Sequence, residues 1–169
     1  VVGAAMRYLV FAVDQTLQRW ERMVFHQFAC LGRDVVEALA QEVGASHVVN
    51  ARTENVVEAI QEITKGGAQY TFESVGNEKV LVQAYEATAR GGTTVSIGLP
   101  HPSKQFAVSA VSIVGQERTI KGSYMGSSVP RRDIPRYINM YKAGLLPVEK
   151  LHTHTLSLED INAGFDKLA

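Results

Sequence analysis

Three short segments of this sequence place glycine beside hydroxyl or apolar residues, a combination that suits the binding of a flat organic ligand. The segments are Ser74-Val75-Gly76, Ile97-Gly98-Leu99 and 122–125. Glycine has no Cβ, so a ligand can approach the main chain closely, while the bulkier neighbours supply apolar walls. Gly76 and Gly98 could equally do no more than form turns, and the pattern alone leaves both interpretations open.

An acidic residue, Asp14, directly follows the apolar run 8–13. In dinucleotide-binding folds a carboxylate at the end of the second strand holds the ribose hydroxyls of the nucleotide. A carboxylate there would also repel a 2′-phosphate, so this position favours NAD over NADP. The alternative is that Asp14 caps a following helix, and the residues do not decide between the two.

Two further kinds of residue have simple explanations. His152 and His154 have the spacing of one strand face and could meet one metal, but no third ligand with suitable context follows, so we expect solvated histidines. The single cysteine, Cys30, can build neither a disulfide framework nor a thiolate zinc cluster. We expect it to be a buried apolar thiol.

A carboxylate and a group of arginines complete the candidates. Glu73 lies in an apolar run, where we expect a buried, hydrogen-bonded carboxylate with a structural role rather than a general base. Arg131, Arg132 and Arg136 could bind a phosphate, although a charged helix start is the better interpretation. We find neither a Ser-His-Asp or Cys-His arrangement nor a Walker loop, and so we predict no catalytic and no metal-binding residue in this chain.

The elements that must position these residues alternate from residue 45 onward. Short β-branched runs at 47–50, 70–75, 93–99 and 119–124 alternate with helical patterns, as βαβ units of a parallel sheet do. Apolar residues recur at helical spacing at Val56, Val57, Ile60 and Ile63, at Val80, Leu81, Ala84 and Ala87, at Ile134, Tyr137, Ile138 and Tyr141, and at Ile161, Phe165 and Leu168. The run 106–114 is either a strand or a short helix.

Glycines and one serine predict the ends of these helices. Gly66-Gly67, Gly91-Gly92 and Gly144 should each end a helix, and Ser157 should cap the start of the last one. The elements together predict an α/β fold with a doubly wound, mostly parallel sheet. Ligands bind at the carboxyl ends of the strands in such sheets, so the three glycine-containing segments should lie along one edge.

The composition excludes several classes of protein. The 169 residues suit one domain, and 46% apolar with 20% charged residues is ordinary for a globular protein. Lys plus Arg total 17 and Asp plus Glu total 17, so the basic excess that holds a phosphate backbone is missing. We expect no nucleic-acid partner and no membrane segment. The start at Val1, without signal-peptide features, leads us to expect a fragment of a cytoplasmic protein.

The stretch from Glu37 to Ala169 resembles the coenzyme domain of zinc-dependent medium-chain alcohol dehydrogenases. The matching segments are ALAQEVGASHVVN (38–50), YTFESVG (70–76), GGTTVSIGLP (91–100), IKGSYMG (120–126) and LSLEDINAGFD (156–166). Each segment alone is weak evidence for the family, and the resemblance rests on the order and spacing of all five. It implies that the α/β fold is Rossmann-like and that the parent protein is an enzyme, an NAD-dependent oxidoreductase.

The resemblance also implies roles for particular residues. Ser74, Val75 and Gly76 would flank the adenosine side of NAD(H), Ile97, Gly98 and Leu99 would line the nicotinamide ribose, and Ser123 and Met125 would face the carboxamide through their main chain. The region 106–123 would be the contact of a homodimer. Zinc belongs to the parent family only, because no residue of this chain matches its ligands.

Residues 1–36 depart from the family pattern. The segment 2–6 looks like the tail of a glycine-rich turn, but the earlier glycines and the first strand are missing. A βαβ connection needs at least about 10 residues, more than lie between this turn and the run 8–13. We favour an altered gene segment over genuine remodelling. The expected domains are an atypical segment at 1–36 and a dinucleotide-binding domain at 37–169, with the catalytic zinc domain absent.

Two functions follow from these observations. The first is the coenzyme-binding domain of an NAD-dependent zinc alcohol dehydrogenase, which carries out hydride transfer between alcohol and aldehyde but is inactive as this chain alone. The second is a non-catalytic dimerisation or scaffold module that has lost nucleotide binding, as the incomplete glycine turn would suggest.

Overall fold

The computed structural model describes residues 10–13, 28–30, 38, 40–42, 45–51, 53–152 and 155–168. Among these, the chain up to Tyr124 forms one compact unit and the chain from Met125 forms another. Each unit is described by itself below. The expected boundary between 1–36 and 37–169 stays a prediction.

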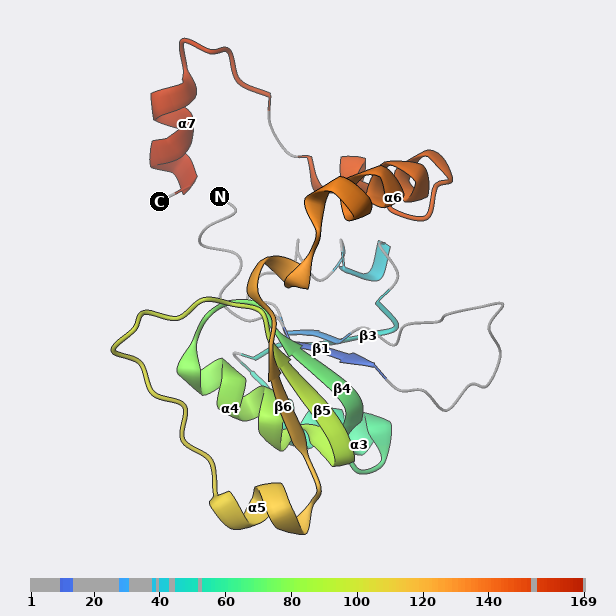
Figure 1. Cartoon of the computed structure of the whole chain (residues 1–169), viewed down its shortest axis with the longest axis vertical. Coiled ribbons are helices and arrows are strands. Elements are labelled where there is room, and N and C mark those ends of the chain that lie inside the picture. Colours follow the sequence, from blue (N-terminus) through green and yellow to red (C-terminus); the bar gives the residue numbers. More distant parts are fainter. Residues whose placement is uncertain are drawn as a thin grey trace. The chain divides into compact units, whose positions relative to one another are not determined.

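Three parallel strands form the centre of the first unit (Figure 1). They are β4 (Ala68–Glu73), β5 (Thr88–Ser96) and β6 (Thr119–Gly122), and β5 lies between the other two. Val95 of β5 pairs with Phe72 of β4 and with Lys121 of β6, so the strands end at nearly the same level. This arrangement confirms the predicted α/β fold with parallel strands.

The outer strands differ from a doubly wound pattern. β1 (Val10–Val13) pairs with β4 in antiparallel direction, with Val10 opposite Glu73 and Val13 opposite Tyr70. β2 (Phe28–Cys30) and β3 (His47–Val49) pair with each other in parallel as a separate two-stranded sheet. The described part of the run 8–13 is therefore not the parallel second strand that the interpretation of Asp14 assumed. Asp14 itself lies outside the described residues, and its role stays a prediction.

The helix α3 (Val56–Thr64) begins and ends close to where the pattern predicted. Its N-cap, Asn55, accepts hydrogen bonds from two main-chain N–H groups of the first turn. Its end differs in one detail, because Lys65 rather than a glycine takes the left-handed conformation, with φ of 57°. Gly66 and Gly67 follow with positive φ, so the chain turns there as expected.

The helix α4 (Glu78–Glu86) ends earlier than predicted. Gly91-Gly92 does not stop it, because β5 already begins at Thr88, whose hydroxyl donates to the carbonyl of Ala84 at 2.8 Å. The glycines instead lie within β5, where the register to β4 shifts. A Cβ on Gly92 would lie 2.7 Å from the Thr88 methyl carbon, so this irregular stretch of strand requires glycine there.

The core of the first unit lies among α3, α4 and the strands. Buried apolar side chains form one cluster: Val49, Val56, Ile60, Ala68, Val80, Ala84 and Ala87. Beside it lies a buried row of hydroxyls, in which Thr88 bonds to Thr71 at 2.8 Å and to Thr94 at 2.7 Å. These bonds satisfy polar groups that would otherwise be costly to bury.

The chain after β5 runs back to the other end of the strands before β6 begins (Figure 1). It contains α5 (Ala110–Gly115), so the run 106–114 ends in a short helix, one of the two predicted alternatives. Tyr85 holds this return segment to α4, because its hydroxyl lies 2.7 Å from the Ser112 hydroxyl and its ring meets Phe106 edge-on. The Arg118 guanidinium lies 4.9 Å from the centre of the same ring.

The second unit contains α6 (Pro130–Lys142) and α7 (Ile161–Leu168), with short 3-10 helices at Tyr124–Ser127, where the units join, and Val148–Leu151. Gly144, with φ of 71°, follows α6 as predicted. The predicted cap of α7 is wrong. Ser157 lies in a preceding turn and donates to the carboxylate of Asp160, and the first helical hydrogen bond runs from Gly164 to the Asp160 carbonyl.

Candidate functional site

The carboxyl ends of β4, β5 and β6 are tied together by main-chain hydrogen bonds. The carbonyl of Glu73 accepts from the N–H of Ile97 at 2.7 Å and of Gly98 at 3.0 Å. The carbonyl of Ser96 accepts from the N–H of Ser123 at 2.9 Å. The structure thus brings the predicted segments 74–76 and 97–99 and residue Ser123 to one edge of the sheet.

Gly76 and Gly98 allow two turns of this edge to touch. Gly76 has φ of 78°, and a Cβ there would lie 2.8 Å from the Leu99 carbonyl oxygen. A Cβ on Gly98 would overlap the main-chain nitrogen of Gly76 and lie 2.6 Å from its Cα. Contact between the two turns is therefore enough to explain both glycines. Their predicted contact with a ligand stays a prediction.

The side chains along this edge differ in exposure. Leu99 is 76% exposed and Ile97 39% exposed, whereas Ser74 and Val75 are half-buried. Exposed aliphatic side chains at the carboxyl ends of parallel strands form an apolar surface that a planar ring can cover. The edge can therefore bind a flat ligand by contact, with main-chain groups close by.

Glu73 lies beneath this edge with a side chain that is 1% exposed. Its Oε1 accepts hydrogen bonds from the N–H of Val75 and of Gly76, both at 2.6 Å, and from that of Asn77 at 3.4 Å. This confirms the expectation of a buried, hydrogen-bonded carboxylate. The engagement of its Oε1 by three main-chain donors suits a structural role.

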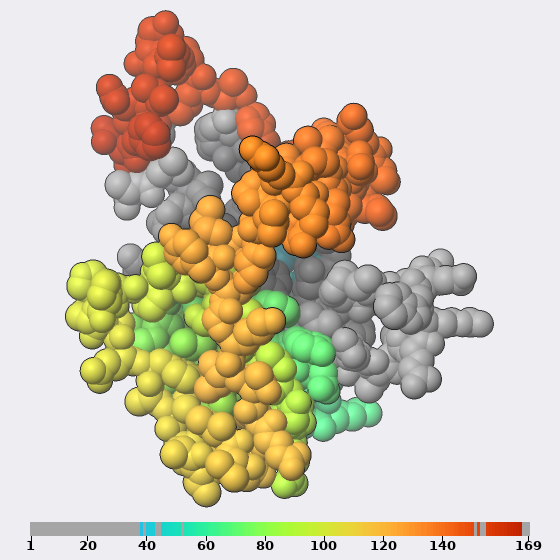
Figure 2. Space-filling model, viewed as in Figure 1, coloured from blue at the N-terminus to red at the C-terminus, as the bar shows by residue number. Residues whose placement is uncertain are grey.

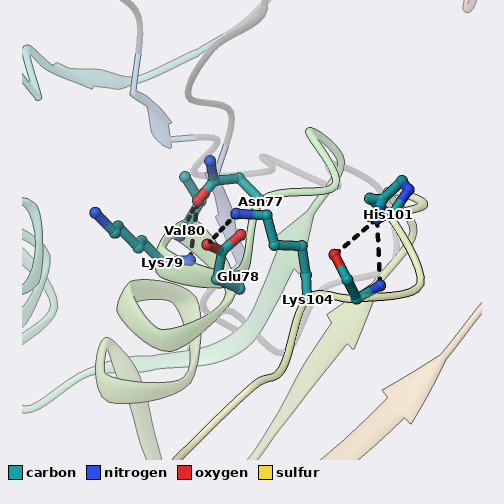
Figure 3. Close-up of polar contacts among 7 residues, drawn as sticks. Asn77, Glu78, Lys79, Val80, His101 and Lys104 are labelled. Atoms are coloured by element: carbon teal, nitrogen blue, oxygen red, sulfur yellow. Dashed lines mark hydrogen bonds and ion pairs between the residues drawn. The ribbon is translucent and has the colours of Figure 1, made fainter.

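The start of α4 carries polar residues that the sequence reasoning missed (Figure 3). The Asn77 side chain accepts from the N–H of Lys79 at 2.9 Å and of Val80 at 3.4 Å, which makes it the N-cap. An asparagine between a strand and an apolar helical pattern is an ordinary capping signal that would have found it.

One ion pair joins the segment after Leu99 to this helix start. The Lys104 ammonium lies 3.1 Å from Glu78 Oε1. Figure 3 draws this contact as a dashed line. A hydrogen bond from its own main-chain N–H, followed by that from Lys104, holds the pKa of Glu78 below its ordinary value. The charges attract across 26 positions of sequence, a pairing that no local pattern could indicate.

The remaining predicted residues fall elsewhere. Met125 belongs to the second unit, with φ of 50°. His152 is exposed and hydrogen-bonds to the Thr155 hydroxyl, in keeping with a surface role, while His154 lies outside the described residues. Among the residues that the structure describes, no three His, Cys, Asp or Glu side chains are grouped so that they could hold a metal ion.

The arginines near the start of α6 serve that helix. The Arg132 guanidinium donates to both carboxylate oxygens of Asp133, at 2.7 and 2.9 Å, and Arg136 lies 3.6 Å from the same carboxylate. The hydrogen bond from Arg132 is the largest cause that lowers the pKa of Asp133 to about 2, followed by that from the Val129 N–H. These contacts support the charged helix start over a phosphate site for Arg132 and Arg136.

The comparisons with known proteins identify the family. A family model described as zinc-binding dehydrogenase matches residues 31–143, which is more than half of the chain. The chain therefore belongs to the zinc-binding dehydrogenase family. The matched region is the coenzyme-binding part of these enzymes.

Relatives of known name agree with this assignment. S-(hydroxymethyl)glutathione dehydrogenase of Paracoccus denitrificans is 36% identical over 141 residues, covering 79% of this chain and 37% of that protein. Alcohol dehydrogenase 1 of Zea mays is 35% identical over 133 residues, covering 77% and 35%. An alcohol dehydrogenase zinc-binding domain protein from Burkholderia ambifaria has a similar structure, with a TM-score of 0.79 at 34% identity over 83% of this chain and 38% of that one.

The chain is short beside these relatives. It spans between 35% and 45% of the length of the first curated relatives that it matches. A search of the described helices for a long apolar stretch that could cross a membrane finds none.

Proposed function

We propose that the carboxyl edge of β4, β5 and β6 binds NAD(H), as the coenzyme-binding domain of an NAD-dependent zinc alcohol dehydrogenase. The observation that carries the proposal is the tie between neighbouring strand ends, in which the Glu73 carbonyl accepts from Ile97 and Gly98 and the Ser96 carbonyl accepts from Ser123. A dinucleotide needs such a continuous edge, because it lies across several strand ends of an α/β sheet.

Each part of the nucleotide has a proposed place. The segment 74–76 takes the adenosine side, 97–99 the nicotinamide ribose, and Ser123 and Met125 the carboxamide. The exposed side chains of Ile97 and Leu99 support the assignment, because they offer apolar contact at the edge. Asp14 is proposed to select NAD over NADP by repelling a 2′-phosphate.

This placement indicates which part of the reaction NAD would carry out and which part the residues of this chain would carry out. Bound NAD supplies the hydride acceptor for oxidation of an alcohol to an aldehyde. The residues of this chain bind the coenzyme and orient its ring, and we derive no step through zinc, for which the described residues offer no ligand group. We propose that the chain is inactive alone. The zinc of the parent enzyme and its cytoplasmic location rest on the family relation.

We further propose that the chain pairs with a second copy through the region 106–123. β6 is the last strand of its sheet, and all four of its residues are exposed. On α5, Val111 is 76% and Val114 79% exposed, and the yellow and orange atoms of this region form a continuous surface in Figure 2. An edge strand with free pairing groups is a natural place for a symmetric contact.

The alternative of a scaffold module without nucleotide binding has one observation in its favour. The strand beside β4 runs antiparallel, whereas a dinucleotide fold places a parallel strand with its glycine-rich turn there. In this alternative the edge at 106–123 would still form a dimer.

Thermal melts with and without millimolar NADH separate the two functions, because a ligand of the native state alone raises its stability by mass action. We expect a rise in Tm with NADH and a smaller one with NADPH. A cooperative melt that NADH leaves unchanged, together with a dimer by analytical ultracentrifugation, would establish the scaffold function instead.

A further inference from the structure

Most main-chain donors at the start of α4 are already engaged within the chain. The N–H groups of residues 75–77 donate to the Glu73 carboxylate, and those of Lys79 and Val80 donate to Asn77. Helix starts of this kind attract phosphate when their N–H groups are open, because donors and the helix dipole point outward. Here the chain's own Glu73 carboxylate occupies the place of the anion.

The same residue also holds the neighbouring turn. Through its carbonyl, Glu73 accepts the N–H groups of Ile97 and Gly98, at 2.7 and 3.0 Å. Five main-chain donors from two turns, at positions 75, 76, 77, 97 and 98, therefore converge on one residue. Gly98 also lies so close to Gly76 that neither position has room for a Cβ, so the two turns are in direct main-chain contact.

We infer that Glu73 is a positioning residue for the coenzyme, an inference that rests on the proposed NAD(H) function. Its carboxylate fixes the 74–77 turn, its main-chain carbonyl holds the 97–99 turn, and Gly76 meets Gly98 between them, so that adenosine and the nicotinamide ribose meet two turns in one fixed arrangement. Because its side chain is 1% exposed, Glu73 acts through the two turns and does not touch the ligand. With the N–H groups of residues 75–77 engaged by Glu73, this turn suits contact with a sugar or base better than binding of a phosphate.

The first test measures amide hydrogen exchange by NMR in the chain without ligand. Glu73→Gln keeps the shape of the side chain but replaces charge-assisted hydrogen bonds by weaker neutral ones. We expect faster exchange at Val75 and Gly76, which donate to the carboxylate. We also expect it at Ile97 and Gly98, which keep their main-chain acceptor, because Gly98 packs against the loosened Gly76. Faster exchange in the 74–77 turn alone, or in neither turn, would overturn the inference.

The second test measures NADH affinity by fluorescence titration. We expect Glu73→Gln to weaken binding about tenfold, because small misplacements of binding groups are expensive. The matched control is Thr71→Val, at a position two residues before Glu73 on the same strand. This substitution removes a buried hydrogen bond between the Thr71 and Thr88 hydroxyls. It should lower Tm and leave affinity within about twofold, since it disturbs the core and not the turns.

The outcomes separate this inference from the proposed function. If the unaltered chain binds no NADH, the proposed function fails, and the exchange measurement still decides whether Glu73 couples the turns. If Glu73→Gln lowers Tm as Thr71→Val does but leaves NADH affinity unchanged, Glu73 is merely structural. Should Glu73→Gln not melt cooperatively, Glu73→Asp, which keeps the charge but withdraws it by one methylene, replaces it in both tests.

Discussion

In the part of the chain that the structure describes, each unit has a buried carboxylate that accepts from the main chain, and the two residues differ in how far their contacts reach. Asp133 accepts from Val129, four residues earlier, and pairs with the adjacent Arg132, so its contacts stay within one helix start. Glu73 accepts from the turn that follows it through its carboxylate, and from Ile97 and Gly98 on the neighbouring strand end through its main-chain carbonyl. Each carboxylate therefore stabilises a local turn or helix start, and only Glu73 also joins two strand ends, through its main chain.

Gly98→Ala should have the largest effect, because it disrupts the contact between the two turns at the strand ends. The new Cβ would overlap the Gly76 nitrogen, and overpacking of this kind lowers the free energy of unfolding by about 3 kcal/mol. Urea denaturation measures the loss, and NADH binding should fall with it. Gly115→Ala is the control, because nothing lies within 4 Å of a Cβ there. Equal stability of the two variants would mean that the turns do not touch in solution.

The contacts of Asp133 at the start of α6 should make the stability of this helix start depend on pH. The folded pKa of Asp133 is about 2, below its ordinary value of 3.8, chiefly because of Arg132. Since the folded pKa is lowered, the stabilisation is complete above the ordinary value and is lost as the pH falls through about 2. An NMR titration of the Val129 amide follows this loss.

Substitution of each arginine in turn tests which group sets the Asp133 pKa. Arg132→Gln should raise the Asp133 pKa towards its ordinary value, and Arg136→Gln should raise it less, because that guanidinium is 3.6 Å away. Asp133→Asn should abolish the titration. An unchanged midpoint in Arg132→Gln would show that the main-chain bond from Val129 governs the pKa by itself.

Leu99→Ala tests whether the strand-end edge is the ligand side of the first unit. Loss of an exposed aliphatic contact should weaken NADH binding about fivefold with little effect on Tm. Leu158→Ala in the second unit is matched in residue type and exposure, at 78% against 76% for Leu99. The comparison fails if both variants bind NADH equally well.

Lys104→Met should have the smallest effect. Its ion pair with Glu78 is largely open to solvent, with the Lys104 side chain 51% exposed, so Tm should fall by no more than about 2 °C and less at high salt. Lys79→Met, in the helix of the partner Glu78, provides a control. A loss of NADH affinity as large as that of Leu99→Ala would instead give this ion pair a role in shaping the edge.

Local patterns predicted the parts of the fold that depend on neighbouring residues. The apolar spacing from Val56 to Ile63 predicted α3, and the run around Tyr70 predicted β4. The errors lie where a distant partner decides. Gly91-Gly92 looked like the end of α4, but pairing of Thr88 with Ala68 of β4 ends the helix sooner. Ser157 looked like a cap, but its hydroxyl bonds to Asp160 in a turn.

The candidate site likewise has features that local sequence patterns predicted and features that they could not predict. Its segments were predictable, because glycine and β-branched residues at strand ends are visible in the sequence, as was the buried state of Glu73. The bonds of Glu73 to Ile97 and Gly98 were not predictable, since the residues lie 24 and 25 positions apart and meet only once the strands pair. The pairing of Lys104 with Glu78 arises in the same manner.

The sequence by itself therefore determined the α/β pattern, the helix and strand positions and the family, because these depend on residue spacing along the chain. Only the tertiary structure decided that β1 runs antiparallel beside β4, that Gly76 and Gly98 touch each other, and that Glu73 holds one turn by its carboxylate and the other by its main-chain carbonyl. Such contacts depend on strand order and direction, which bring together groups that no local pattern relates.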